Sequence, residues 1–344
     1  MTIIKTQKTQ EQEIKKIPKE LEKIGQDQLD LKELIDTSSE DFGQYWVKLL
    51  NKKGSLQGKL SFKDALSRKL VIYVPGFPGD GATSFEQTYL DTLVKNKYTV
   101  FTLRHNGTVI NTKLSFKYIN CVKKQTKARF AKEKILGDRD DYTLNDWLKE
   151  PYLALGVLAE HFEDIYLIGH SLGGLCSIYS LLDFSLTHGN LIHKVTRLVS
   201  LAGTTGIIRS KQSQILKRWQ ELLNFEIYQK AVQVGDSTKN LAYLKQAYQR
   251  IHKKSAQYLP KSLEFLMLCA WGDSEGTIDE YINPVENLEL IGNLGRGCLK
   301  LVKKAKPVSP EEMAHDFNFL DPQTILNMLT LDLEQENQIG ALYC

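Results

Sequence analysis

The sequence lacks both the cysteine pattern of a disulfide-rich domain and the long apolar run of a membrane span. Its 344 residues include five widely spaced cysteines and no Cys-x-x-Cys pair, which argues against a disulfide framework and against a zinc knuckle. No apolar run approaches the roughly 18 residues that cross a bilayer. The first residues contain no apolar stretch of signal-peptide length. These absences predict a soluble, cytoplasmic protein.

Compositional bias is also absent. Apolar residues make up 42% of the chain and charged residues 25%, which are ordinary values for globular proteins. This balance argues against collagen, a fibrous coiled coil and intrinsic disorder for the bulk of the chain. No internal repeat is visible in the sequence.

The net charge of +4 is small but unevenly distributed. Residues 113–134 carry a net charge of +7 and residues 209–261 carry +8, so the rest of the chain is acidic. Two explanations are open: lysine-rich helices that are simply solvated, or a surface that collects an anionic substrate or contacts an anionic membrane. Nucleic acid is not expected as a partner, because the acidic remainder of the surface would repel phosphates.

A pattern of buried strands begins at residue 68. Continuous apolar runs predict six strands, at residues 70–74, 98–103, 165–168, 198–202, 265–270 and 299–302. Helices are predicted between or after them, at about 85–93, 145–161, 172–182 and 322–330. Strands that read as continuous apolar runs are typical of parallel sheets with both faces covered. The alternation therefore predicts an α/β fold with a mostly parallel sheet and helices on both faces.

Two insertions interrupt this alternation, and each contains one of the basic blocks. The first, at about 108–143, lies between the second predicted strand and its helix. The second, at about 208–262, lies between the fourth and fifth strands and has the apolar spacing of two amphipathic helices. Both follow strand ends on the side where α/β folds bind their ligands.

Residues 1–66 form a polar leader ahead of the main domain at 67–344. Apolar residues of the leader follow the spacing of one helical face: Phe42, Tyr45, Trp46, Leu49 and Leu50. The spacing predicts a helix there. Because about 50 residues form too small a core to stand alone, we expect this helical leader to dock on the main domain.

The segment Gly-His-Ser-Leu-Gly at 169–173 follows the third predicted strand and precedes an apolar helix. A Gly-x-Ser-x-Gly pattern in this context is typical of a nucleophile elbow, a tight turn that holds the Ser171 hydroxyl out at the end of the sheet. Such a turn requires small residues two positions before and two positions after the serine. The alternative is a glycine-rich turn that only packs.

Phosphate binding is a competing interpretation of a glycine-rich turn. A Walker A loop ends in Gly-Lys-Ser or Gly-Lys-Thr, and neither glycine loop of this chain, at 75–81 or 169–174, has that ending. A dinucleotide fingerprint needs glycine at the position of Ser171. Both phosphate-binding motifs are therefore rejected.

A serine hydroxyl is a weak nucleophile until a base accepts its proton. In the elbow architecture the order along the chain is serine, acid, histidine, so the base should follow the fifth predicted strand. His315 is the one histidine of the seven that lies there. It is the predicted base, and a surface-loop histidine is the alternative. His105, just beyond the second strand, is assigned no function.

The carboxylate that orients such a base is expected just past the fifth predicted strand. Asp273 and Glu275 both lie there, and Asp279 is a more distant candidate. From the spacing alone, either Asp273 or Glu275 qualifies.

An oxyanion needs two preorganised N–H donors. The amide of Leu172, directly after the nucleophile, is one candidate. The other is the amide of Phe77, in the Pro-Gly-Phe-Pro-Gly loop at 75–79 after the first predicted strand. Its glycines permit the backbone turn that aims the Phe77 amide at the site.

Together these residues resemble the α/β-hydrolase superfamily over about residues 68–335. The resemblance rests on the loop at 75–77, the elbow at 169–173, the loop at 272–275 and His315. The block at 209–261 resembles the cap that many members insert between the same two strands. We therefore expect a helical cap over the site.

The family commonly carries its acid three residues after a glycine that closes the strand, which favours Glu275 over Asp273, although aspartate is usual there. Two further departures stand out. Pro75 occupies a position where the family often has histidine, which changes how the oxyanion loop is supported. Arg104 and His105 stand where an acidic residue and a Gly-x-Gly turn are usual.

The resemblance implies a carboxylesterase, lipase or thioesterase that uses neither metal nor cofactor. Ser171 would attack a small-molecule ester or thioester, His315 would move the proton, Glu275 or Asp273 would orient His315, and the Phe77 and Leu172 amides would hold the oxyanion. The alternatives are a peptidase or acyltransferase on the same triad, and a non-catalytic binding module of the same fold. Oligomeric state is left open.

Overall fold

The computed structural model describes most of the chain in segments. These are residues 19–25, 27–30, 35–36, 41–77, 84–110, 134–135, 137–206, 208, 213–224, 234–271, 284–303 and 321–333. Most of the first insertion, about 108–143, lies outside these residues. No described helix is long and apolar enough to cross a membrane.

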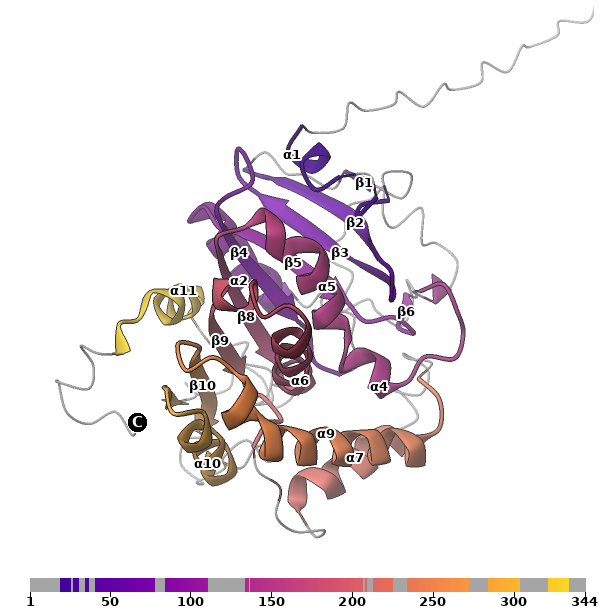
Figure 1. Cartoon of the computed structure of the whole chain (residues 1–344), viewed down its shortest axis with the longest axis vertical. Helices are drawn as coiled ribbons and strands as arrows, with labels where there is room; N and C mark the ends of the chain where they lie inside the picture. Colours follow the sequence, from indigo (N-terminus) through magenta and orange to yellow (C-terminus); the bar gives the residue numbers. More distant parts are fainter. Residues whose placement is uncertain are drawn as a thin grey trace, which may run out of the picture.

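Within the described residues, nine strands form one mixed sheet in the order β1-β2-β3-β5-β4-β8-β9-β10-β11 (Figure 1). Their bounds are β1 Ile35–Asp36, β2 Gly43–Asn51, β3 Gly54–Phe62, β4 Lys69–Val74, β5 Thr99–Arg104, β8 Asp164–His170, β9 Val195–Leu201, β10 Glu264–Trp271 and β11 Gly297–Lys303. Pairing is antiparallel from β1 to β5 and parallel from β5 to β11. Two short strands, β6 Val109–Ile110 and β7 Lys134–Ile135, pair apart from this sheet. The six predicted strands and the mostly parallel α/β sheet are confirmed.

The helices follow the strands closely. Their bounds are α1 Lys19–Glu22, α2 Ser84–Lys95, α4 Leu144–Trp147, α5 Glu150–Leu158, α6 Leu172–Thr187, α7 Gln214–Asn224, α9 Ser237–Tyr258, α10 Pro284–Leu294 and α11 Pro322–Thr330. Short 3₁₀ turns occupy Ala159–His161 and Ile192–Lys194. The helix expected at 145–161 is therefore divided into α4, α5 and a 3₁₀ turn. Helix α10 was not predicted.

Helices cover both faces of the sheet, and strand β9 demonstrates it. Arg197 and Ser200 are three positions apart, so their side chains point to opposite faces. Arg197 donates hydrogen bonds to carbonyls at the end of α11, whereas the Ser200 hydroxyl lies against Gly174 of α6. Helix α2 packs on α11 and helix α5 packs on α6, so each face carries one of these pairs.

The structure corrects the helix predicted from Phe42 to Leu50. These residues lie mainly in strand β2, which pairs with β3 as an antiparallel hairpin, and β3 pairs with β5. Trp46 and Val47 are both buried, although neighbours in a strand point to opposite faces. A strand buried on both faces places apolar residues at adjoining positions and imitates helical spacing over so short a run. The hairpin thus extends the sheet across the division expected at residue 66.

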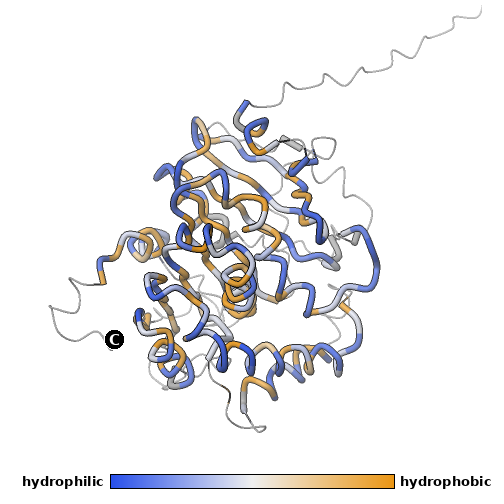
Figure 2. The backbone as a smooth tube through the Cα atoms, in the orientation of Figure 1, coloured by the Kyte–Doolittle hydropathy of each residue, from blue (hydrophilic) through white to orange (hydrophobic). Residues whose placement is uncertain are grey.

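Two amphipathic helices do occupy the second insertion, as predicted. Helix α9 contacts α4, α6, α7 and α10, and Figure 1 shows it running across the molecule beside α7, far from the hairpin. Figure 2 shows hydrophilic and hydrophobic residues alternating along α9. Its buried face includes Leu244, Tyr248 and Ile251, and its exposed face includes Lys245 and Lys253. We call α7 and α9 the cap helices.

Candidate active site

Ser171 lies between the end of β8 and the start of α6, in a strained conformation. Its φ of 52° and ψ of −119° fall in a region that L-residues rarely adopt, and such strain persists only where the surroundings enforce it. Here the Ser171 amide donates to the Leu201 carbonyl at 2.9 Å, and the Ser171 carbonyl accepts from the amides of Gly174 at 3.1 Å and Thr204 at 3.0 Å. The backbone of the serine is therefore fixed by β9 and by the loop that follows it.

The glycines around Ser171 are required by close backbone packing. A Cβ added at Gly169 would lie 2.5 Å from the backbone of Gly173, and one added at Gly173 would lie 2.0 Å from the Val74 carbonyl oxygen. Neither contact can be relieved by a side-chain movement. The turn therefore has the tightness that the Gly-x-Ser-x-Gly pattern predicts.

The loop after β4 lies directly against the serine. A Cβ added at Gly76 would come within 2.8 Å of the Ser171 Cβ. Phe77 follows Gly76, and Leu172 is the first residue of α6. The structure thus brings Ser171, Leu172 and the Gly76–Phe77 segment together at the carboxyl end of the sheet. That the Phe77 and Leu172 amides bind an oxyanion stays a prediction.

The predicted base and the predicted acids, His315, Glu275, Asp273 and Asp279, lie outside the described residues. The strands that precede them are described. Strands β10 and β11 pair in parallel with Trp271 opposite Lys303, so the chain leaves both strands at the same edge of the sheet. This is the edge at which β8 delivers Ser171. The assignment of base and acid stays a prediction.

Sequence reasoning missed a buried pair beside the Gly76 loop, formed by His105 and Glu150. The His105 side chain is fully buried and that of Glu150 is 2% exposed. The Nδ1 atom of His105 lies 2.5 Å from Oε2 of Glu150, and its Nε2 atom lies 3.2 Å from the carbonyl oxygen of Pro75. The signal available was a histidine at the carboxyl end of a buried strand.

Trp147 and Asn106 also contact this pair. The Trp147 ring stacks on the His105 ring, with centroids 4.3 Å apart and planes 6° from parallel. The Asn106 amide donates to Oε1 of Glu150 at 2.9 Å, and the Trp147 indole donates to the Asn106 carbonyl at 2.6 Å. Contacts with Glu150, Pro75 and Trp147 therefore set the position of the imidazole ring.

The cap helices reach the site through aromatic residues. The Phe77 ring lies 5.9 Å from that of Trp147 and 6.1 Å, edge-on, from that of Trp219 in α7. The Trp219 indole donates to the Tyr248 hydroxyl at 3.3 Å, and this hydroxyl donates to the Thr204 carbonyl at 2.6 Å. Burial raises the pKa of Tyr248, so its hydroxyl stays protonated and the cap stays tied to the loop that holds Ser171.

Glu286, in the first turn of α10, was also missed. Its side chain packs against Gly206 in the loop after β9, where an added Cβ would lie 2.9 Å from the Glu286 Cβ. Burial raises the pKa of Glu286, and the nearby Glu289 carboxylate raises it further. Next to it, the Thr205 hydroxyl donates to Asn287 at 2.5 Å, which fixes α10 to the same loop.

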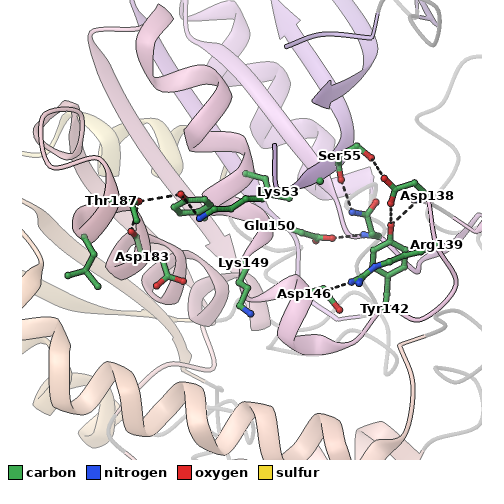
Figure 3. Close-up of a pocket in the computed structure, with 15 residues that line it drawn as sticks. Lys53, Ser55, Asp138, Arg139, Tyr142, Asp146, Lys149, Glu150, Asp183 and Thr187 are labelled. Carbon is green, nitrogen blue, oxygen red and sulfur yellow. Dashed lines mark hydrogen bonds and ion pairs between the residues drawn. The ribbon is translucent and has the colours of Figure 1, made fainter. Parts of the chain in front are cut away.

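A cavity of about 780 Å³ lies between the β2–β3 turn, the segment at 138–150 and the end of α6 (Figure 3). Its described lining includes Asn106 and Glu150 but not Ser171. Two charged groups of its wall have ion-pair partners: Arg139 binds Asp146 at 2.5 Å, and Asp183 binds Arg250 of α9.

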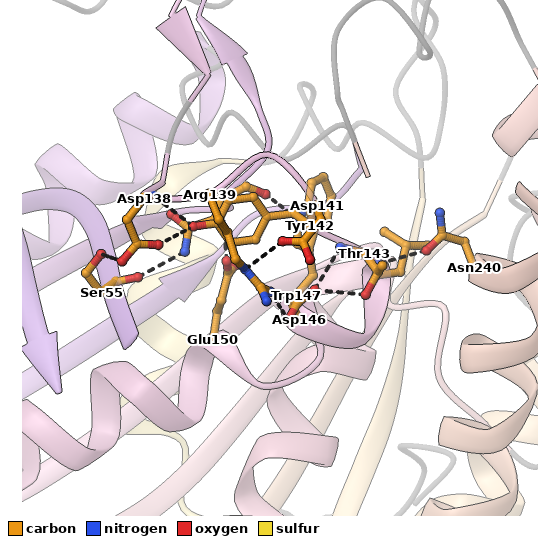
Figure 4. A network of polar contacts seen from close by, with 12 residues as sticks. Ser55, Asp138, Arg139, Asp141, Tyr142, Thr143, Asp146, Trp147, Glu150 and Asn240 are labelled. Carbon is orange, nitrogen blue, oxygen red and sulfur yellow. Dashed lines mark hydrogen bonds and ion pairs between the residues drawn. The ribbon is translucent and has the colours of Figure 1, made fainter. Parts of the chain in front are cut away.

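A polar network connects this wall to the cap (Figure 4). The Tyr142 hydroxyl donates to Asp138 at 2.7 Å; burial and this bond raise the pKa of Tyr142 to about 12, and the same bond lowers the pKa of Asp138. Asp146 accepts from the amide and the hydroxyl of Thr143, at 2.8 Å each. The Leu144 amide then donates to Asn240 of α9 at 2.9 Å. Helix α4 is thus bound on one side to the cap.

Comparison with known families gives one match, to the alpha/beta hydrolase fold, over residues 69–263. No curated protein matches the chain. Among the described residues, no group of histidine, cysteine, aspartate and glutamate side chains could hold a metal ion.

Solved structures with a similar fold include several esterases and lipases. Est1E from Butyrivibrio proteoclasticus shares 13% identity and a TM-score of 0.49, over 83% of this chain and 97% of its own. Carboxyl esterase 2 from Tuber melanosporum shares 14% identity and a TM-score of 0.49, over 84% of this chain and 88% of its own. The monoacylglycerol lipase of Paleococcus ferrophilus shares 17% identity and a TM-score of 0.47, over 80% of this chain and 98% of its own.

Proposed function

Because the chain belongs to the alpha/beta hydrolase fold family, we propose that this hydrolase cleaves a carboxylic ester or thioester through an acyl-serine intermediate. One observation carries the proposal. Ser171 has a φ of 52° at the carboxyl end of β8, with Gly76 packed against its Cβ. Backbone strain at a non-glycine residue in a turn at the end of a sheet is typical of a residue held ready for chemistry.

The proposed reaction begins when Ser171 Oγ attacks the substrate carbonyl carbon and His315 accepts the hydroxyl proton. The amides of Phe77 and Leu172 stabilise the negative charge that develops on the carbonyl oxygen. As the tetrahedral intermediate collapses, His315 returns the proton to the departing alcohol or thiol. Water then attacks the acyl-serine with His315 again as base, which releases the acid and restores the Ser171 hydroxyl.

Glu275 is proposed to orient His315 and to stabilise its protonated form, with Asp273 as the alternative. The parallel register of β10 and β11 supports this arrangement, because the chain leaves both strands at the edge where Ser171 stands. Aromatic side chains gather beside the nucleophile: Phe77 contacts Trp147 and Trp219. These rings favour a substrate with an apolar acyl or alcohol group next to its ester.

A fluorophosphonate probe tests the proposal directly, because it phosphonylates an activated serine. Wild type should be labelled at Ser171 and should hydrolyse p-nitrophenyl esters, whereas Ser171→Ala should lose about 10⁴-fold or more of this activity. Ser180→Ala is a matched control, since Ser180 is a buried serine of the same helix that binds the Leu148 carbonyl. A folded wild-type protein that neither labels nor hydrolyses these esters would contradict the proposal.

A further inference from the structure

We propose that His105, paired with Glu150, is a positioning residue that holds the oxyanion loop against Ser171. This inference rests on the proposed function, since it assigns how one part of that site is supported. The loop follows strand β4, and His105 directly follows β5, the strand that pairs with β4.

Both nitrogens of the His105 ring have a partner. Nδ1 faces Glu150 Oε2 at 2.5 Å, and Nε2 faces the Pro75 carbonyl oxygen at 3.2 Å. Because a carbonyl oxygen can only accept, Nε2 is the donor in the bond to Pro75. The other oxygen of Glu150 accepts from the Asn106 amide at 2.9 Å, so the carboxyl group that holds Nδ1 is itself fixed in place.

The ring cannot turn away from the Pro75 carbonyl. Trp147 stacks on one face of it at 4.3 Å, and the Trp147 indole is itself anchored to the Asn106 carbonyl at 2.6 Å. Neither His105 nor Glu150 is more than 2% exposed. Water is thus excluded as a replacement donor for the carbonyl.

The held carbonyl belongs to the peptide that packs on the nucleophile. A Cβ added at Gly173 would lie 2.8 Å from the Pro75 oxygen, and one added at Gly76 would lie 2.8 Å from the Ser171 Cβ. The Pro75–Gly76 peptide is therefore confined between His105 and the elbow. Because a peptide unit is planar, fixing its carbonyl also fixes the nitrogen and Cα of Gly76, the atoms from which the chain continues to the Phe77 amide.

This arrangement predicts an effect on the chemical step more than on substrate binding. An oxyanion donor acts through its position in the transition state, and removal of one such donor lowers kcat by about 10²–10³-fold. A donor that is displaced but still present should give a smaller loss. A pair that served stability alone would leave kcat of the folded enzyme unchanged.

Three variants of the full-length protein test the inference. His105→Phe keeps an aromatic ring on Trp147 but removes both ring nitrogens. Glu150→Gln keeps the size of the side chain but replaces the carboxyl group that holds Nδ1, and it is the variant to use if His105→Phe does not fold. Glu264→Gln is the matched control, since Glu264 pairs with buried Arg197 at the opposite end of the sheet.

We expect His105→Phe to lower kcat for a p-nitrophenyl ester by about 100-fold and Glu150→Gln by about 10-fold, each with KM changed less than about threefold. Fluorophosphonate labelling should slow in parallel. Glu264→Gln should lower the melting temperature and leave kcat within about twofold. Equal losses of kcat in all three variants, or loss of melting temperature alone, would overturn the inference.

A crystal structure of His105→Phe separates this inference from the proposed function. If wild type neither hydrolyses esters nor labels at Ser171, the proposed function fails, and the position of the loop still decides the inference. A Pro75 carbonyl that turns away from the new ring supports positioning by His105. A carbonyl and a Gly76 that stay in place would refute it.

Discussion

Each end of the parallel sheet holds a basic side chain paired with a carboxyl group, and the two pairs differ in what else they bind. At the amino end, Arg197 of β9 pairs with Glu264 of β10, its register partner. Arg197 also donates to the carbonyls of Met328 and Leu331, at 2.6 Å each, and Glu264 also binds Arg296 at 2.7 Å. These contacts fasten the end of α11 to the sheet.

At the carboxyl end the basic side chain is His105, and its second partner is a loop carbonyl rather than a helix end. The carbonyls at the end of α11 belong to a helix C-terminus, where the charge of Arg197 is favourable in itself. The Pro75 carbonyl belongs to the loop that touches Ser171. A paired basic side chain thus stabilises an element of the fold at one end and sets the position of a reacting segment at the other. Substitutions at the amino end should therefore lower stability and leave the reaction rate unchanged, whereas those at the carboxyl end should lower the reaction rate.

The largest expected effect lies at the carboxyl end and concerns rate alone. Glu275→Gln should lower ester hydrolysis by about 10⁴-fold, because a neutral partner favours the wrong tautomer of the catalytic histidine. Asp273→Asn should lower ester hydrolysis much less. Steady-state kinetics and melting temperatures measured side by side check this. The reverse ranking would assign the acid to Asp273, and mild effects from both would exclude both residues.

The amino end should respond in stability and not in rate. Arg197→Met leaves Glu264 with one of its two cations and removes both bonds to the end of α11. Breaking a buried pair in this way should lower the free energy of unfolding by about 3 kcal/mol, measured by urea denaturation. Ester hydrolysis per folded molecule should be unchanged. A fall in kcat comparable to that of His105→Phe would erase the distinction between the two ends.

A smaller loss is expected where the cap meets the carboxyl end. Tyr248→Phe removes the hydroxyl that serves both the Thr204 carbonyl and the Trp219 indole, so two buried polar groups lose a partner. The free energy of unfolding should fall by about 1–3 kcal/mol. Tyr243→Phe, on the same helix and only half-buried, is the control and should be nearly neutral. Equal stability of the two variants would show that the cap is held by other contacts.

The smallest effect is a pH-dependent one at Glu286. Its pKa is raised by burial and by Glu289, so the native state holds the proton more tightly than the unfolded chain. The free energy of unfolding therefore falls as pH rises through the raised pKa. Glu286→Gln removes this penalty and should stabilise the protein slightly at pH 7, by about 0.5 kcal/mol or less, and not at pH 4. The exposed Glu160→Gln should show no such difference; a gain at both pH values would point to packing instead.

The parallel half of the fold could be predicted from sequence because each of its strands is a continuous apolar run. Strand β4, for instance, is buried from Leu70 to Val74, and these residues are apolar throughout and do not alternate with polar ones. The hairpin could not be predicted in the same way. The residues of β2 satisfy helical spacing as well as strand burial, and only pairing with β3, which in turn pairs with β5, decides between helix and strand.

The nucleophile was predictable and the pair behind it was not. Ser171 lies within a five-residue motif whose glycines are each explained by a backbone contact. His105 and Glu150 are 45 positions apart, and nothing local indicates that the folded chain brings them together. Their juxtaposition depends on α5 packing beside the end of β5. The one available signal was a histidine at the carboxyl end of a buried strand.

The hairpin has a consequence for aggregation. A chain beginning at residue 69, where the family match starts, would turn β5 into an edge strand. Phe101 packs so closely over β3 that a Cβ at Gly58 would lie 2.6 Å from its ring, and removal of β3 would expose that ring beside a row of unpaired backbone donors and acceptors. Such an edge is a template for pairing with other chains. A truncated form, or a chain that loses β2 and β3 after cleavage ahead of residue 69, would meet this hazard.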